Sequence, residues 1–335
     1  MSIGSPDSTV GIEDHPASAE PERAKGVAHG KSPTRIAMDR LRKDRVAIVC
    51  AVIVLLFVLL AILAPVLTKL EGADIGTFHP DLVDAYGFPV NGPTSAHWFG
   101  VEPKTGRDNF ARWVYGARPS LIVAFVATIF GTVVGVVMGL LAGFLGGWVD
   151  RLISWVVDFV LSLPYLLFAI AMVPIVEQLR GGSFNLSPSQ QASIRFFVLI
   201  FVLSFFGWAG LARIIRGEVL SLREREFVLA AKAIGVPTRQ VLFKELLPNL
   251  VAPIVISASL ALPAYVTAEA GLSFLGVGLI EPVPSWGQTI ATATNWFKAD
   301  PIYLWLPVLG ITILVLALAL LGDAVRDAFD PKTRR

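Results

Sequence analysis

Residues 46–68 read VAIVCAVIVLLFVLLAILAPVLT, a run of 23 residues that contains no charged side chain. A helix needs about 20 such residues to cross the hydrocarbon core of a membrane, which is about 30 Å thick. The run is also longer than the apolar segment of a signal peptide, which has about 7–15 residues. We therefore expect it to remain in the protein as a first transmembrane helix.

Five further apolar runs follow the first. They cover residues 119–148, 152–176, 196–212, 246–268 and 301–322, and only the run 152–176 contains a charge, Asp158. The runs are continuously apolar instead of alternating, which favours helices over strands. The sequence therefore predicts an all-α integral membrane protein with six transmembrane helices.

The composition agrees with a membrane protein. The chain has 335 residues, of which 54% are hydrophobic and 16% are charged, whereas a soluble domain has about 25% charged residues. The net charge of +2 and the absence of a basic, aromatic stripe argue against a nucleic-acid partner. One cysteine and four widely spaced histidines match no metal site, and we expect neither a metal nor a catalytic residue.

Basic residues predict the orientation, because Lys and Arg are retained on the cytoplasmic side of a membrane. Five of them directly precede the first run: Arg35, Arg40, Arg42, Lys43 and Arg45. We therefore expect a cytoplasmic N-terminus and, after six spans, a cytoplasmic C-terminal tail over residues 323–335. The segment between the fourth and fifth runs is also rich in Lys and Arg, as a cytoplasmic segment should be.

The remaining segments complete the expected organisation. Residues 1–33 are poor in large apolar side chains and are predicted to be a disordered cytoplasmic tail, and residues 34–68 combine the basic flank with the first span. Within the tail, GVAHGKS at 26–32 has too few residues between its glycines for a phosphate-binding loop, so a different chain would have to bind ATP. Residues 69–118 form an external loop with enough aromatic residues to be ordered, and residues 119–322 form a core with five spans.

The segment 217–249 is too polar to enter the membrane, yet its pattern is helical. Phe227, Ala230, Ala231 and Ile234 fall on one face of a helix that should end at Gly235, where we expect a left-handed backbone. Pro237 then opens a second short helix, and Pro248 should end it before the fifth span. Two short helices joined by a tight turn suit docking into a groove of another protein; a solvated linker is the alternative.

Here the sequence resembles a known family. Ala230, Ala231, Gly235, Leu247 and Pro248 match the EAA loop of binding-protein-dependent ABC importer permeases. Two positions depart from that pattern, because Leu229 stands in place of its glutamate and Glu245 in place of its isoleucine. Glu226 is the nearest carboxylate that could replace the missing one.

Four other motifs resemble one branch of this family, the dipeptide, oligopeptide and nickel importers, and in particular its C-type permease. They are HWFG at 97–100 with GRD at 106–108, YGARPSL at 115–121, EAGLSFLG at 269–276 with PSWG at 284–287, and GDAVRDAFDP at 322–331. The resemblance covers about residues 36–332 and implies the type I ABC importer permease fold.

The resemblance implies a function as well as a fold. The chain would be a permease subunit in a bacterial inner membrane, paired with a homologous permease, two cytoplasmic ATPases and an external substrate-binding protein. ATP and Mg would be used by the ATPases and no cofactor by this chain. The expected substrates are peptides, with nickel or another small solute as the alternative. An intramembrane enzyme would need paired aspartates or a Ser-His arrangement, and an ion-coupled carrier would need more intramembrane charge.

Several residues within the spans are candidate sites. Gly131, Gly135, Gly139 and Gly143 recur at every fourth position, which predicts close helix packing or a moving seam. Two intramembrane carboxylates are functional candidates because such groups are costly to bury in lipid. Glu269 should either face the pathway or bridge helices and subunits. Asp158, which lies before a kink expected at Pro164, is assigned a structural role.

Overall fold

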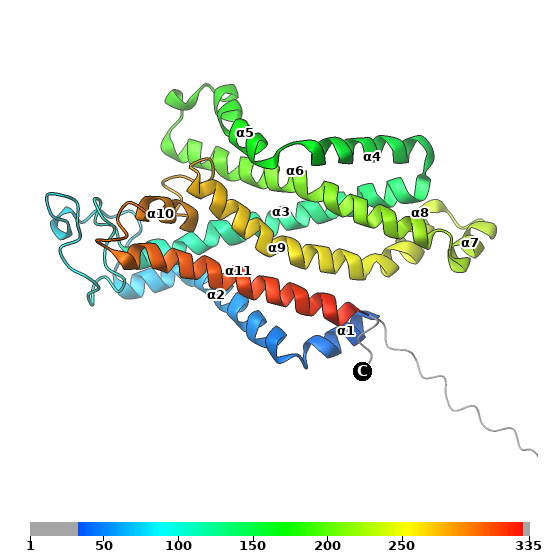
Figure 1. Cartoon of the computed structure of the whole chain (residues 1–335), viewed down its shortest axis with the longest axis horizontal. Coiled ribbons are helices and arrows are strands. Elements are labelled where there is room, and N and C mark those ends of the chain that lie inside the picture. The colour runs from blue at the N-terminus through cyan, green and yellow to red at the C-terminus, as the bar shows by residue number, and fades with distance from the viewer. Residues whose placement is uncertain (1–32, 331–335) are drawn as a thin grey trace, which may run out of the picture. The chain divides into compact units, whose positions relative to one another are not determined.

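The computed structural model describes residues 33–330, so the predicted tail 1–33, apart from its last residue, and the motif at 26–32 lie outside the described residues. Within that range the regular elements are helices (Figure 1). The longer helices are α1 (Pro33–Leu41), α2 (Arg45–Glu71), α3 (Asn109–Leu145), α4 (Gly147–Ser162), α5 (Tyr165–Leu179), α6 (Pro188–Leu222), α7 (Glu226–Ala233), α9 (Val251–Phe274), α10 (Trp286–Ala293) and α11 (Pro301–Phe329). Short helical turns lie at Pro80–Leu82, Ser183–Asn185, Thr238–Gln240 (α8), Val241–Leu246 and Leu247–Leu250.

Five helical segments are long and apolar enough to cross a membrane: α2, α3, α6, α11 and the continuous stretch Thr238–Phe274. A sixth crossing requires α4 and α5 to count as one span, although they are bent by 87°. The kink expected at Pro164 is present, and it is sharp enough to divide the predicted span 152–176 into two helices. Pro164 has no N–H to continue the helix and forces Leu163 into an extended conformation, with ψ at 132°.

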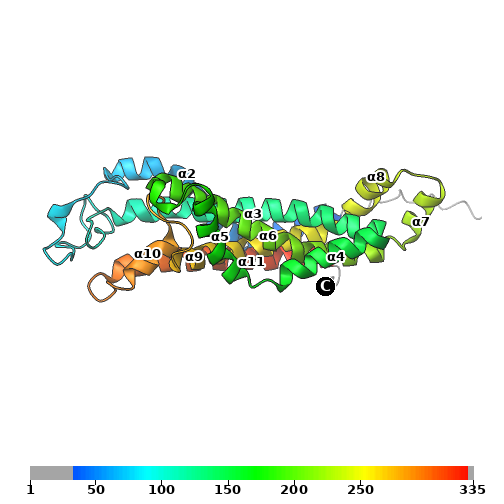
Figure 2. The ribbon, with the colours of Figure 1, turned by 90° about the horizontal axis from the view of Figure 1, so that it is seen from above.

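The chain returns repeatedly to the same two ends of the bundle. In Figure 1, α1, α7, α8 and the last turns of α11 lie at one end, whereas the loop after α2 and α10 lie at the other, and Figure 2 shows the same separation of α7 and α8 from α10. The α4–α5 pair carries the chain from the α7 end back to the α10 end in Figure 1. The pair thus acts as one pass, and six passes leave both described ends of the chain on the same side.

Several helix boundaries differ from the apolar runs. α3 begins at Asn109 because Asp108 caps it by accepting a hydrogen bond from the Ala111 N–H. α6 continues ten residues past Ala212, and α11 continues to Phe329. A charge-free run marks only the part of a helix inside the hydrocarbon, and charged residues can extend the same helix into water. The predicted external loop is therefore shortened to residues 72–108.

The second short helix of the segment 217–249 does not end at Pro248. Instead α8, a π-helical turn and a 3-10 turn lead without a break into α9. Pro248 lies in the first turn of that 3-10 segment. The change of hydrogen-bonding pattern absorbs the missing N–H of the proline, so the helix can pass through it.

The helices pack around α3. It runs along α6 and also contacts α2, α4 and α9, while α9 and α11 pack together. α2 packs against α3 and α11, and α4 and α5 cover α6. Among the clusters of buried side chains, one joins α6 and α7 around Ile215, Val219 and Val228, and another joins α3, α9 and α10 around Trp286.

Candidate functional site

The segment between α6 and α9 forms a protrusion at one end of the bundle. α7 follows α6 after a short turn and packs inward through Val228 and Ala231, which join Val219, Val241 and Leu246 in one apolar cluster. The predicted apolar face points the other way for three of its four residues. Phe227 is 41% exposed, Ile234 is 80% exposed, and Ala230 is exposed between them. The sequence pattern identified this face but did not identify Val228 as the residue that anchors it.

The turn after α7 has the backbone expected from the sequence. Gly235 has φ of +78°, and the Val236 N–H donates to the Ala231 carbonyl at 3.0 Å. Pro237 then stands at the N-cap of α8. Leu247 is half-buried and Pro248 is exposed in the helical stretch that leads into α9. Glu226 is exposed at the start of α7 and makes no hydrogen bond or ion pair with the described residues.

Glu269 lies at the centre of a second cluster, and its side chain is completely buried. The Ser273 and Ser285 hydroxyls donate to Oε1 at 2.7 and 3.0 Å, and the Ser120 hydroxyl donates to Oε2. Ser273 in turn accepts the Leu279 N–H at 3.0 Å. The carboxylate therefore connects α3, α9 and the start of α10 inside this chain. Ser120 and Ser285 belong to motifs that the sequence singled out, but their contact with Glu269 could not be read from it.

We predict a clear difference between two substitutions of Glu269. Glu269→Gln keeps an oxygen acceptor and should preserve the fold. Glu269→Leu removes every acceptor and leaves three hydroxyls unpaired, each at a cost of about 1–3 kcal/mol, so it should lower the melting temperature and the yield. Thermal unfolding of the purified variants in detergent measures both effects, and equal stability of the two variants would contradict the bridging arrangement.

The four glycines of α3 lie along α6. A methyl group on Gly135 would lie 2.8 Å from the Trp208 carbonyl oxygen, one on Gly139 2.7 Å from Ile215 Cβ, and one on Gly143 2.7 Å from Val219 Cβ. Gly131 has more room, because its nearest neighbour would be the Tyr265 hydroxyl at 3.5 Å. Gly135, Gly139 and Gly143 therefore allow α3 and α6 to approach closely along the half of α6 that leads to α7.

Asp158 lies on the outer face of α4, where its side chain is 69% exposed and pairs with Arg213 of α6 at 2.6 Å. Two turns earlier, Asp150 accepts two hydrogen bonds from the Arg216 guanidinium. Both arginines were expected in the segment that follows the fourth span, and the structure instead places them in α6. These two ion pairs tie α4 to α6.

A family model described as the binding-protein-dependent transport system inner membrane component matches residues 135–335, and a model of the N-terminal transmembrane domain of oligopeptide transport permease C matches residues 32–80. The chain belongs to the binding-protein-dependent permease family. It is therefore a multi-pass inner-membrane ABC permease, as the sequence motifs predicted.

Relatives of this permease align over nearly its whole length. The dipeptide transport system permease protein DppC of Alkalihalophilus pseudofirmus is 37% identical, over 90% of this chain and 91% of its own. The oligopeptide transport system permease protein OppC of Bacillus subtilis is 30% identical, over 89% of this chain and 90% of its own. OppC of Escherichia coli is 34% identical, over 91% of this chain and 93% of its own. Among solved structures, this chain is similar to a chain of the inward-facing MetNI methionine ABC transporter, with 23% sequence identity and a TM-score of 0.50. The match covers 65% of this chain and 96% of the MetNI chain. This last likeness concerns the fold, which is that of an ABC importer permease.

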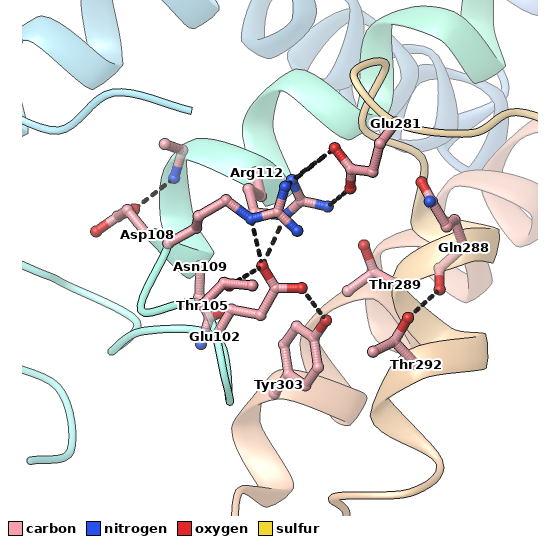
Figure 3. Close-up of polar contacts among 12 residues, drawn as sticks. Glu102, Thr105, Asp108, Asn109, Arg112, Glu281, Gln288, Thr289, Thr292 and Tyr303 are labelled. Atoms are coloured by element: carbon pink, nitrogen blue, oxygen red, sulfur yellow. Dashed lines mark hydrogen bonds and ion pairs between the residues drawn. The ribbon is translucent and has the colours of Figure 1, made fainter. Parts of the chain in front are cut away.

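The structure also shows a polar cluster in this permease that the sequence did not predict (Figure 3). The buried Glu102 accepts hydrogen bonds from Arg107 Nε at 2.7 Å and from the Tyr303 hydroxyl at 2.7 Å, while Arg112 pairs with Glu281 at 2.6 Å. The cluster joins the loop 72–108 to α3, to the segment before α10 and to α11. The motif GRD at 106–108 was its only signal in the sequence.

The neighbouring cations explain why the Glu102 carboxylate stays ionised although it is buried. Burial alone would raise the pKa of Glu102, but Arg112, Arg107 and the Tyr303 hydroxyl outweigh burial and hold that pKa below its usual range. A carboxylate whose pKa is lower in the folded state than in the unfolded state stabilises the fold at pH values above its unfolded pKa. This stabilisation is lost as the pH falls through the pKa of the folded state. The loop is therefore fastened to the bundle at neutral pH.

Among the described residues there is no group of His, Cys, Asp and Glu that could hold a metal ion.

Proposed function

We propose that this permease and a homologous permease together form the membrane pathway of an ATP-driven peptide importer. The names of its relatives support peptides as the substrate class, since DppC proteins belong to dipeptide and OppC proteins to oligopeptide transport systems. Separate ATPase subunits would use ATP and Mg, and an external substrate-binding protein would deliver the peptide. This chain would contribute no catalytic residue and no cofactor of its own.

The observation that carries the proposal is the outward apolar face of α7. Phe227, Ala230 and Ile234 are exposed at an end of the bundle, beyond the apolar part of the spans. Arg225, Lys232 and Arg239 of the same segment are also exposed. An amphipathic helix with an unpaired apolar face is suited to a groove on a partner protein. We assign the groove to an ATPase subunit, with the segment 217–249 as the coupling loop.

The proposal requires the α7 end of the bundle to be cytoplasmic, as the basic residues predicted. Reporter tags inserted at residues 80 and 290 should then be external, and tags at 20, 235 and 333 should be internal. Protection of each tag from a membrane-impermeant label in intact cells measures its side. An external tag at 235 would rule out ATPase binding at the coupling loop.

The function itself is tested by reconstitution. The chain should be purified together with its permease partner and ATPases and placed in vesicles with the cognate binding protein. We expect uptake of a labelled dipeptide or oligopeptide that requires ATP and both permeases. ATP hydrolysis by this chain alone, or uptake that persists without the ATPases, would contradict the proposal.

A further inference from the structure

A groove of about 370 Å³ runs between α2 and α11, near the end of the bundle where α1 lies. Its sides are Val46, Val49 and Ile53 of α2 and Ile313, Leu316 and Leu320 of α11, with Cys50 and Ala317 also lining it. Val49 is 58% exposed, whereas Cys50 and Ala317 are buried. The groove is therefore open along its length and apolar down to its floor, at the level of the membrane-spanning part of both helices.

One charged residue, Arg45, lines this groove at its outer end. Arg42 and Lys43 precede it in the turn between α1 and α2, and all three side chains are exposed. None of the three forms a hydrogen bond or ion pair with a described residue. The intervening Asp44 is already engaged, because its carboxylate caps α2 by accepting the Val46 and Ala47 N–H groups at 2.8 and 3.3 Å. The turn thus carries three basic side chains without an ion-pair partner in the described part of the chain, and its local charge is +2 when the Asp44 carboxylate is counted.

The position of this basic turn is fixed by α1. The Arg40 guanidinium donates to the Ala328 carbonyl at 3.1 Å and to the Asp330 carbonyl at 3.0 Å, which fastens α1 to the C-terminal end of α11. A cation at this position is favoured by the negative end of the helix dipole. Asp323 and Asp327, in the last turns of α11, are exposed and form no ion pair with the turn. The three charges are therefore held at the end of the two helices that form the groove.

We propose that this groove binds an anionic phospholipid from the leaflet on the side of the N-terminus. One acyl chain would lie between α2 and α11, and the phosphate of the headgroup would lie against Arg42, Lys43 and Arg45. Basic clusters beside a transmembrane helix attract anionic lipids, with a contribution of about fivefold in affinity from each charge. Arginine also matches phosphate with a pair of parallel hydrogen bonds. This inference does not depend on the transported substrate or on the ATPase.

Lipid titration followed by native mass spectrometry tests the charge requirement. The full-length chain, with its co-purifying subunits, would be stripped of lipid in detergent and titrated with phosphatidylglycerol or phosphatidylethanolamine carrying identical acyl chains. We expect phosphatidylglycerol to bind about tenfold more tightly or better, and R42Q/K43Q/R45Q to abolish this preference. Lys69→Gln, at the opposite end of α2, is the matched control and should keep it. Arg45→Gln alone provides a milder variant that should lower the preference several-fold.

A second pair of variants tests the groove. Val49→Trp and Leu316→Trp replace exposed side chains, so they should fold, and each indole would fill the space assigned to the acyl chain. Both should weaken phosphatidylglycerol binding although every basic residue is retained. Equal affinity of the wild-type chain for the two lipids overturns the proposal. So does a preference that survives in the triple variant, or binding that the two tryptophan variants leave unchanged.

Discussion

Replacing Gly139 with alanine should destabilise the permease more than any other single methyl group added to the α3–α6 contact. The new methyl carbon would lie 2.7 Å from Ile215 Cβ and 2.8 Å from the Ala212 carbonyl oxygen. The second contact is with backbone, which cannot move aside as a flexible side chain can. Overpacking of this kind costs about 1–3 kcal/mol. We expect a lower melting temperature in detergent and less assembled protein in the membrane.

Gly217 of α6 provides a matched control, since a methyl group there would meet no atom within 4 Å. Alanine is also the better helix former, by about 0.8–1.0 kcal/mol, so Gly217→Ala should be neutral or stabilising. The two variants make the same chemical change in neighbouring helices, and only Gly139→Ala should destabilise the protein. If Gly139→Ala is as stable as the wild type, the close approach of α3 and α6 is not what the glycines provide.

Gly235→Val should uncouple the permease from its proposed ATPase partners. Gly235 has φ of +78°, and a residue with a Cβ atom in this left-handed region is less stable by about 1–2 kcal/mol. A methyl group at this site would meet no atom within 4 Å, so the effect must come from backbone strain instead of a clash. Relief of that strain would shift α7 relative to α8 and displace the face that carries Ile234. Co-purification of the ATPases and substrate-stimulated ATP hydrolysis measure the loss.

Gly235→Asn is the control for this turn, because asparagine adopts left-handed conformations more readily than valine. It should retain most of the coupling, and both variants should insert normally, because apolar runs direct insertion. Wild-type ATPase binding and hydrolysis in Gly235→Val would show that the turn is not the pivot of a docking loop.

The sequence predicted the spans because their signal is local. Charge-free runs located each crossing, and the start of α11 at Pro301 coincides with the start of its run. Helix ends were less visible, although some carried a readable signal. Ser187 and Gln190 form a capping box with Pro188 at the first helical position, a pattern that predicts the start of α6 well before Phe196. The 87° bend between α4 and α5 had its signal in Pro164, but a proline does not specify the angle of a break.

Contacts between distant segments could not be predicted in the same way. Glu269 was visible as an intramembrane carboxylate, but its partners Ser120 and Ser285 are 149 and 16 residues away in the chain. Only the packing of α3, α9 and α10 brings them together. The glycine spacing likewise identified a face of α3 without identifying α6 as the helix that meets it. Arg112 and Tyr303 gave no sign of their common contact with Glu102, since each looks ordinary in its own segment.

The close fit of α3 against α6 has a mechanical consequence. α6 has 35 residues and at 1.5 Å per residue extends for roughly 52 Å, from the α10 end of the bundle to the turn before α7. The glycine contacts with α3 and the ion pairs with α4 stiffen it, so it behaves as a lever with α7 attached to one arm. A tilt of roughly 5° about its middle would move each tip by roughly 2 Å in opposite directions. A force applied at α7 is thereby delivered to the far side of the membrane with its direction reversed.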